Sequence, residues 1–182
     1  MLRHEEDLYG ALKKDLGKSR MESYMCEIGL TLSELTWMEK HIGRLTREKR
    51  VPTPLAQFAR KKFSVPDTVR HGSDHSPWNY PVLLTLEPLI DALAAGNTVI
   101  VKPSAYAPAT SAVMEMIIKE TYPPEYVRMI TGGRQENQAL LTQRFDKIFF
   151  TGGKTVGREV LRHAAEYLTL SPWNSVGKVR VS

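Results

Sequence analysis

The sequence predicts an α/β fold in which a helical N-terminal region precedes a doubly wound parallel sheet. Apolar residues recur at helical spacing over residues 5–47. From Trp78 onward, short β-branched runs alternate with helical segments. Strands and helices that alternate in this way form parallel sheets covered by helices.

Two helices are expected before residue 51. They are marked by apolar residues three or four positions apart: Leu8, Leu12 and Leu16 in the first, and Ile28, Leu32, Leu35, Met38 and Ile42 in the second. Gly17 ends the first helix, because glycine readily adopts the left-handed C-cap conformation. Pro52 and Pro54 break the second, since proline cannot continue a helix. We expect residues 55–66 to form an extended, exposed arm.

The remaining chain alternates between helix and strand. We expect helices over residues 82–95, 108–120, 137–143 and 155–167, and strands over residues 98–101, 126–130 and 147–150. The run Thr98-Val99-Ile100-Val101 is β-branched, as a strand buried on both faces requires. Sheets of this kind bind ligands beyond the carboxyl ends of their strands, so candidate binding residues should follow the strands.

The composition limits the class of protein. No apolar run reaches the about 18 residues that cross a bilayer, and no apolar signal core follows Met1. The single cysteine, Cys26, excludes an internal disulfide and suits a reducing compartment, so we expect a cytoplasmic protein. Cys26 is interpreted as a structural thiol. The five histidines show no metal-ligand spacing, and we expect no metal site.

The charge distribution leaves the choice of partner open. The net charge is +5, and part of the basic excess lies in residues 40–62, where Glu48 is the one acid. A nucleic-acid surface is one interpretation. No aromatic interleaving, zinc spacing or recognition helix supports it. We therefore expect no nucleic-acid partner, and interpret this segment as a solvated surface or a contact with another part of the protein.

A glycine turn links the last predicted strand to the helix that follows it. Gly152, Gly153 and Gly157 would let the backbone approach a ligand, and the helix N-terminus would offer free N–H groups to an anion. The spacing matches neither the common dinucleotide fingerprint nor a P-loop. A tight structural turn explains these glycines equally well.

Lys102 ends the predicted strand over residues 98–101. A lysine at this position can snorkel to solvent or can bind a ribose or phosphate group. The following Pro103 and Ser104 turn the chain sharply, which would aim the lysine at the ligand crevice.

Asn79 lies in a stiff loop, because Pro77 and Pro81 bracket it together with Trp78. A side-chain amide that is fixed before charge develops can stabilise an oxyanion. The competing interpretation is a surface turn that caps the next helix, with Trp78 as a core anchor.

These segments also share a resemblance. They are Ser76-Pro77-Trp78-Asn79-Tyr80-Pro81, Val99-Ile100-Val101-Lys102-Pro103-Ser104 and Phe149-Phe150-Thr151-Gly152-Gly153 with Gly157, in this order and at this spacing. Together with His4-Glu5-Glu6-Asp7, Lys13-Lys14-Asp15-Leu16-Gly17, Glu27-Ile28-Gly29 and Val51-Pro52-Thr53-Pro54 they make residues 4–170 resemble the class 3 branch of the aldehyde dehydrogenases, which includes fatty-aldehyde enzymes.

The resemblance implies an aldehyde dehydrogenase-like, Rossmann-like sheet that binds NAD or NADP. It implies that Asn79 donates to the oxyanion and that Trp78 and Gly153 lie near the pyrophosphate. Lys102 would bind the adenosine ribose, and Val156 would pack near the adenine. The same cofactor site would include Ser104, Gly132 and Gly152.

The reaction implied is oxidation of an aldehyde to a carboxylic acid. A cysteine adds to the carbonyl, hydride passes to the cofactor, and water releases the acid. Ala105 stands where family members often carry a glutamate that holds the ribose hydroxyls, so NAD and NADP both remain open. The resemblance also implies an aldehyde substrate and a homodimer for the intact enzyme.

The sequence stops at Ser182, before the place of the family's catalytic cysteine and general base. We therefore expect an N-terminal, cofactor-binding fragment with little or no dehydrogenase activity alone. The alternative is a remnant that binds a nucleotide or a partner subunit without catalysis.

Two segments depart from the resemblance. Residues 67–75 are polar where a parallel sheet needs its first buried strand. With a permitted choice of codons, a double frameshift restores V-P-E-P-Y-G-T-V-L-I-I-S-P-W-N-Y-P. A second shift turns residues 171–182 into L-P-V-E-L-G-G-K-S-P-C-V, so the Pro172-Trp173-Asn174 repeat would be accidental. A strand without its large apolar side chains, each worth about 1.5–3 kcal/mol when buried, should leave the fold marginal.

The chain accordingly divides into four parts. Residues 1–50 form the N-terminal helical region, and residues 51–76 form the arm and a disrupted first strand. Residues 77–170 form the NAD(P)-binding domain, and residues 171–182 form a tail unlike the family. The catalytic domain is expected to be absent.

Overall fold

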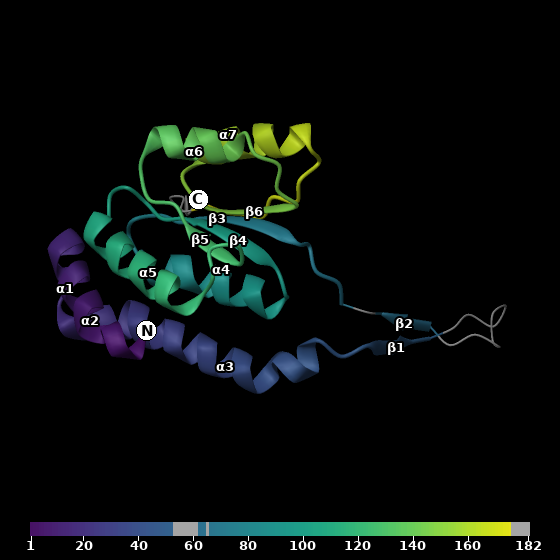
Figure 1. Cartoon of the computed structure of the whole chain (residues 1–182), viewed down its shortest axis with the longest axis horizontal. Coiled ribbons are helices and arrows are strands. Elements are labelled where there is room, and N and C mark those ends of the chain that lie inside the picture. Colours follow the sequence, from purple (N-terminus) through teal and green to yellow (C-terminus); the bar gives the residue numbers. More distant parts are fainter. Residues whose placement is uncertain (53–61, 65, 176–182) are drawn as a thin grey trace, which may run out of the picture.

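The computed structural model describes residues 1–52, 62–64 and 66–175, the side chain of Ser175 excepted. A parallel sheet forms the middle layer of the molecule (Figure 1). Helices α6 (Arg134–Leu141) and α7 (Lys154–Glu166) cover one face, and α4 (Leu83–Ala94) and α5 (Pro108–Thr121) cover the other. The N-terminal helices pack outside α4 and α5.

The N-terminal region and the arm contain the remaining elements before the sheet. They are a 3-10 turn η1 (Leu2–His4), α1 (Glu5–Leu16), α2 (Arg20–Ser23), a π-helical turn η2 (Tyr24–Ile28), α3 (Gly29–Leu45), β1 (Lys49–Val51) and β2 (Lys62–Ser64). As expected, α1 ends at Gly17, whose φ of 69° is left-handed. The antiparallel pair β1–β2 leaves the body of the molecule as an exposed arm (Figure 1). Residues 53–61 and 65 of the predicted arm lie outside the described residues.

The sheet has the order β5-β4-β3-β6-β7, and every pair in it is parallel. Its strands are β3 (His71–His75), β4 (Thr98–Lys102), β5 (Val127–Met129), β6 (Lys147–Gly152) and β7 (Trp173–Ser175). This topology confirms the predicted doubly wound α/β fold. The three predicted strands correspond to β4, β5 and β6.

The segment expected to be a disrupted first strand pairs as a strand, although its side chains are polar. Residues 71–75 form β3, the central strand, which hydrogen-bonds to β4 on one side and to β6 on the other. Backbone pairing with two apolar neighbours imposes the strand, although its own side chains are polar. Likewise, part of the tail forms β7 beside β6, while residues 176–182 lie outside the described residues.

Two apolar clusters lie on opposite faces of the sheet. The first joins α1, η2, α4 and α5 to β4 and β5, and includes Leu8, Leu12, Ile28, Leu89, Val101 and Met114. The second joins α6, α7 and β6, and includes Leu140, Leu141, Phe145, Ile148, Phe150 and Val160. The predicted stripe of α3 is only partly buried, because Leu35 and Ile42 are exposed. Helix α6 begins at Arg134, three residues before the predicted start at residue 137, because its N-cap is Gly133.

No helix in the described part of the chain is long and apolar enough to cross a membrane.

Candidate functional site

The predicted site residues lie beyond the carboxyl ends of four neighbouring strands. Lys102 ends β4, Asn79 follows β3, Gly132 follows β5, and Gly152 ends β6. Because β5, β4, β3 and β6 are adjacent and parallel, these ends meet at one edge of the sheet. The structure therefore brings the four positions to the same side of the molecule.

Lys102 is buried, and its ammonium is held by backbone oxygens. Nζ donates to the carbonyl oxygens of Pro103 and Gly132, each at 2.8 Å. Burial lowers the pKa of Lys102, while nearby Glu136 acts in the opposite direction. The lysine thus links the loops after β4 and β5. Its contact with a ribose stays a prediction.

Gly132 and Glu136 form a compact turn. Gly132 is among the site residues predicted from the sequence, and Glu136 is not. Gly132 has φ of 127°, and a Cβ there would lie 2.5 Å from the Glu136 side chain. Oε2 of Glu136 accepts the N–H of Gly133 at 2.6 Å, and backbone hydrogen bonds lower the pKa of Glu136. Glu136 lies three residues after the N-cap Gly133 and accepts its N–H, which is one half of a capping box; Gly133 has no side chain to form the other half. A glutamate at this spacing is the signal in the sequence that could have identified Glu136.

The glycine turn after β6 has both structural and open positions. A Cβ at Gly152 would lie 2.5 Å from the Phe150 ring, and one at Gly157 would lie 2.9 Å from Trp173. A Cβ at Gly153, the N-cap of α7, would meet nothing within 4 Å. Close packing thus accounts for glycine at positions 152 and 157, and a contact of Gly152 with the cofactor stays a prediction. The exposed backbone at Gly153 remains available to a ligand.

The first turn of α7 places Val156 at the surface, where 48% of it is exposed. Ser104 lies in the loop after β4 and shapes a turn. Its Oγ accepts the N–H of Tyr106 at 3.3 Å, and its carbonyl oxygen accepts the hydroxyl of Ser111 at 3.3 Å.

Trp78 and Asn79 differ in their surroundings. Trp78 is 53% exposed, so its interpretation as a core anchor was wrong. Oδ1 of Asn79 is buried without a hydrogen-bond partner among the described residues. The Asn79 carbonyl oxygen accepts Nζ of Lys18 at 3.0 Å. Lys18 thus holds the backbone of Asn79. The Asn79 side-chain oxygen does not cap the helix that follows, which was the competing interpretation.

The central strand β3 carries buried polar groups that no site prediction included. Asp74 is 3% exposed, and neither carboxylate oxygen has a partner among the described residues, so burial raises its pKa well above 3.8. Ser73 Oγ lies 2.9 Å from His75 Nε2 on the other face. Burial and Lys102 lower the pKa of His75 to about 4.

From the sequence, Cys26 is interpreted as a structural thiol and no metal site is expected. Cys26 is a free, partly buried cysteine in η2. Within the described ranges, no group of three or more histidine, cysteine, aspartate or glutamate side chains could hold a metal ion.

Comparison with known proteins gives the family. The aldehyde dehydrogenase family profile matches residues 1–174. A 4,4'-diaponeurosporen-aldehyde dehydrogenase of Staphylococcus aureus is 41% identical over 165 residues, which are 91% of this chain and 36% of that protein. Aldehyde dehydrogenase family 3 member H1 of Arabidopsis thaliana is 36% identical over 166 residues, which are 91% of this chain and 34% of that protein.

A solved structure agrees with these matches. The substrate-bound state of Staphylococcus aureus AldH superposes with a TM-score of 0.95 at 39% identity, over 97% of this chain and 38% of that one. The chain spans about a third of the length of the relatives it matches. It belongs to the aldehyde dehydrogenase family, and its relatives include class 3 members.

Proposed function

We propose that this chain is the NAD(P)-binding part of an enzyme that oxidises aldehydes to carboxylic acids. The single observation that carries the proposal is the convergence of Asn79, Lys102, Gly132 and Gly152 on one sheet edge in a member of this family. The relative from Staphylococcus aureus is itself named as an aldehyde dehydrogenase. The proposal includes an intact enzyme that acts in the cytoplasm as a homodimer.

The residues at this edge fit a dinucleotide. The first turn of α7 offers backbone N–H groups, and open space around Gly153 lets a pyrophosphate approach them. Trp78 and Val156 expose apolar surface that can contact the nucleotide. Lys102 brings a positive charge, and Ser104 lies in the adjoining loop. Bound NAD(P) would supply the hydride acceptor.

Asn79 is proposed to contact the reacting oxygen. Lys18 holds its backbone carbonyl oxygen, which limits the movement of the residue before negative charge develops on an aldehyde oxygen. A donor that needs no reorganisation stabilises that charge more effectively than a mobile one. The nucleophile and the general base of the reaction are proposed to belong to sequence that this chain does not contain.

Binding and catalysis can be separated by experiment. NAD+ and NADP+ are titrated into the purified 182-residue chain, and aldehyde-dependent formation of NADH or NADPH is assayed on the same sample. Saturable binding without turnover supports a cofactor-binding part that needs the rest of an enzyme. Turnover would contradict the proposed absence of the catalytic groups. A folded chain that binds neither cofactor would contradict the proposal as a whole and would favour the subunit-binding remnant.

We also propose that residues 67–75 and 171–182 are read from shifted frames. Two features of β3 and of the residues just before it support the first shift. Arg70 has φ of 82°, a region in which side chains are strained, and the restored sequence has glycine there. The restored sequence also has isoleucine in place of Asp74, whose buried carboxylate has no hydrogen-bond partner in the part of the chain that the structure describes. Sequencing of the genomic DNA across codons 66–76 and from codon 165 tests the proposal, and an unaltered reading would contradict it.

A further inference from the structure

We propose that Lys18 and Glu27 are a positioning pair that fixes the loop carrying Asn79. The inference rests on the proposed function, in which the Asn79 side chain contacts the reacting oxygen. Both residues belong to the N-terminal helical region, more than 50 positions from the loop that they contact. Neither is part of the predicted site.

Lys18 holds the middle of the loop. Its Nζ lies 2.5 Å from Oε1 of Glu27 and donates to the carbonyl oxygen of Asn79 at 3.0 Å. The same ammonium lies 4.2 Å from the centre of the Tyr80 ring, a distance at which a cation is attracted to the ring face. One buried charge therefore contacts two consecutive residues of the loop.

Glu27 holds the end of the loop. Its Oε2 accepts the backbone N–H groups of Val82 at 2.7 Å and of Leu83 at 3.4 Å. These donors lie at the start of α4, where a carboxylate satisfies groups that have no partner within the helix. Lys18 and Glu27 thus contact the loop at Asn79 and at Val82, and their opposite charges also bind each other.

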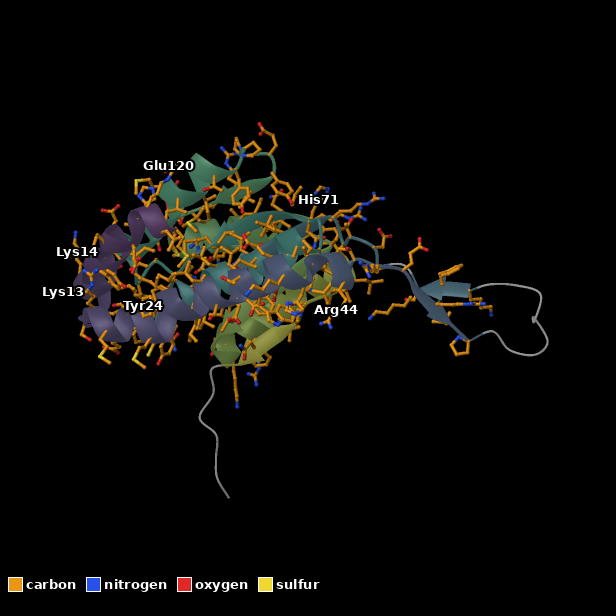
Figure 2. The ribbon with its side chains drawn as sticks, turned by 90° about the horizontal axis from the view of Figure 1, so that it is seen from below. Lys13, Lys14, Tyr24, Arg44, His71 and Glu120 are labelled. Carbon is orange, nitrogen blue, oxygen red and sulfur yellow. The ribbon has the colours of Figure 1, made fainter. Side chains whose placement is uncertain are left out.

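The π-helical turn η2 places Glu27 at this position. A Cβ at Gly29 would lie 2.8 Å from the carbonyl oxygen of Tyr24, so this turn requires glycine. Within η2, Glu27 is fully buried, whereas Tyr24 is exposed on the outer side of the helices together with Lys13 and Lys14 (Figure 2). Single π-helical turns inside helices are frequent at functional sites.

Energetics favour a role in geometry over a role in stability. Glu27 is 0% exposed and Lys18 is 8% exposed, so both charges have lost most of their hydration. Replacing a buried ion pair by apolar residues of similar volume is often neutral or stabilising. Here the pair specifies the position of a loop that two prolines already stiffen.

The test replaces the pair and observes the loop. The double variant Lys18→Met/Glu27→Leu is compared with Lys119→Met/Glu115→Leu, which removes an ion pair of α5 whose lysine is exposed and whose glutamate is partly buried. We expect the Val82 amide to exchange its hydrogen about tenfold faster or more in the first variant, because its charged acceptor is gone. The NMR signals of the Asn79 side-chain amide should shift or broaden, while unfolding stays cooperative. The control should change neither readout.

Unchanged Val82 exchange and unchanged Asn79 signals in a folded double variant would overturn the inference. If that variant does not fold, Glu27→Gln keeps the shape and removes the charge, and the same two readouts decide. NAD+ titration separates the two proposals. If the loop loosens in the double variant but the folded, unmodified chain does not bind NAD+, only the proposed function is refuted. If the unmodified chain binds NAD+ but the loop is unchanged in the double variant, only the positioning role of Lys18 and Glu27 is refuted.

Discussion

The ammonium of Lys102 donates to the carbonyl oxygen of Gly132, 2.8 Å away, and so joins the loops that follow β4 and β5. It donates equally to the carbonyl oxygen of Pro103. The lysine is 2% exposed, so these two bonds replace its hydration. The charge is therefore fixed at the sheet edge by the protein itself, in the place where a cofactor is proposed to bind.

Replacing Lys102 by methionine should lower the stability of the fold. Lys102→Met leaves two carbonyl oxygens without their donor, and we expect the free energy of unfolding to fall by about 1–3 kcal/mol. Urea unfolding at neutral pH measures this change. Lys119→Met, at an exposed position of α5, should alter stability by less than about 0.5 kcal/mol. Equal stability of Lys102→Met and the unmodified chain would show that the carbonyls find other partners.

Asp15 connects α1 to the start of α5. Its carboxylate accepts the N–H groups of Ala109 at 3.2 Å and Thr110 at 2.7 Å, and the hydroxyl of Thr110 at 2.8 Å. We expect Asp15→Ala to destabilise the fold by about 1–2 kcal/mol, the usual cost of losing a helix cap. Asp7→Ala, which removes an exposed carboxylate of α1, is the control. A loss no larger than that of the control would contradict the capping role.

Replacing Arg70 by glycine should make the fold more stable. Its φ of 82° disfavours any residue with a Cβ by about 1–2 kcal/mol, whereas glycine adopts this region without strain. After the entropic cost of glycine in the unfolded chain, we expect Arg70→Gly to raise the melting temperature by a few degrees. Arg144→Gly, at a position without positive φ, should lower it. The same sign of change in both variants would count against strain at Arg70 and weaken the proposed frame shift.

Asp74 and His75 should give stability an unusual dependence on pH. Burial raises the pKa of Asp74 well above 3.8, so the stabilising effect of its bound proton is present at low pH and is lost as the pH rises through the folded pKa. His75 acts in the opposite sense, because burial lowers its pKa from 6.5 to about 4. Its contribution, about 3 kcal/mol, is present above pH 6.5 and is lost as the pH falls toward 4.

The variant Asp74→Asn separates these effects. At pH 8 it should be more stable than the unmodified chain, because the amide carries no charge to bury. The difference should shrink toward pH 4, where the Asp74 carboxyl is protonated. Urea unfolding between pH 4 and pH 8 measures both curves. Parallel curves would mean that Asp74 does not titrate in this range.

The elements that the sequence predicted carry their own local signal. β4 and β6 have β-branched or aromatic runs, and α1 ends at a glycine that adopts the expected conformation. The place of β3 was expected only from the need of the sheet for a first strand, because its polar residues carry no strand signal of their own. Pairing with β4 and β6, which lie far along the chain, holds it in the sheet.

The site was predictable in outline and not in its contacts. The positions of Asn79 and Lys102 after two strands follow from their motifs. The partner of Lys102, Gly132, lies 30 residues away, and the partner of Asn79, Lys18, lies 61 residues away. No periodicity or spacing encodes such pairs, since the packing of whole elements creates them.

The most direct test of the proposed cofactor site is an NAD+ titration of the unmodified chain and of Gly153→Asp. A Cβ at Gly153 meets nothing within 4 Å, so the substitution should leave the fold intact, and an aspartate at the N-cap favours α7. Its carboxylate would occupy the N–H groups that the pyrophosphate needs and would repel the anion. Gly43→Asp in α3 is the matched control.

We expect the unmodified chain and Gly43→Asp to bind NAD+ saturably. Gly153→Asp should keep its stability and bind NAD+ with an affinity that is lower by a factor of about ten or more. Equal affinity in all three proteins, or no binding by the folded unmodified chain, would contradict a cofactor site at this edge of the sheet.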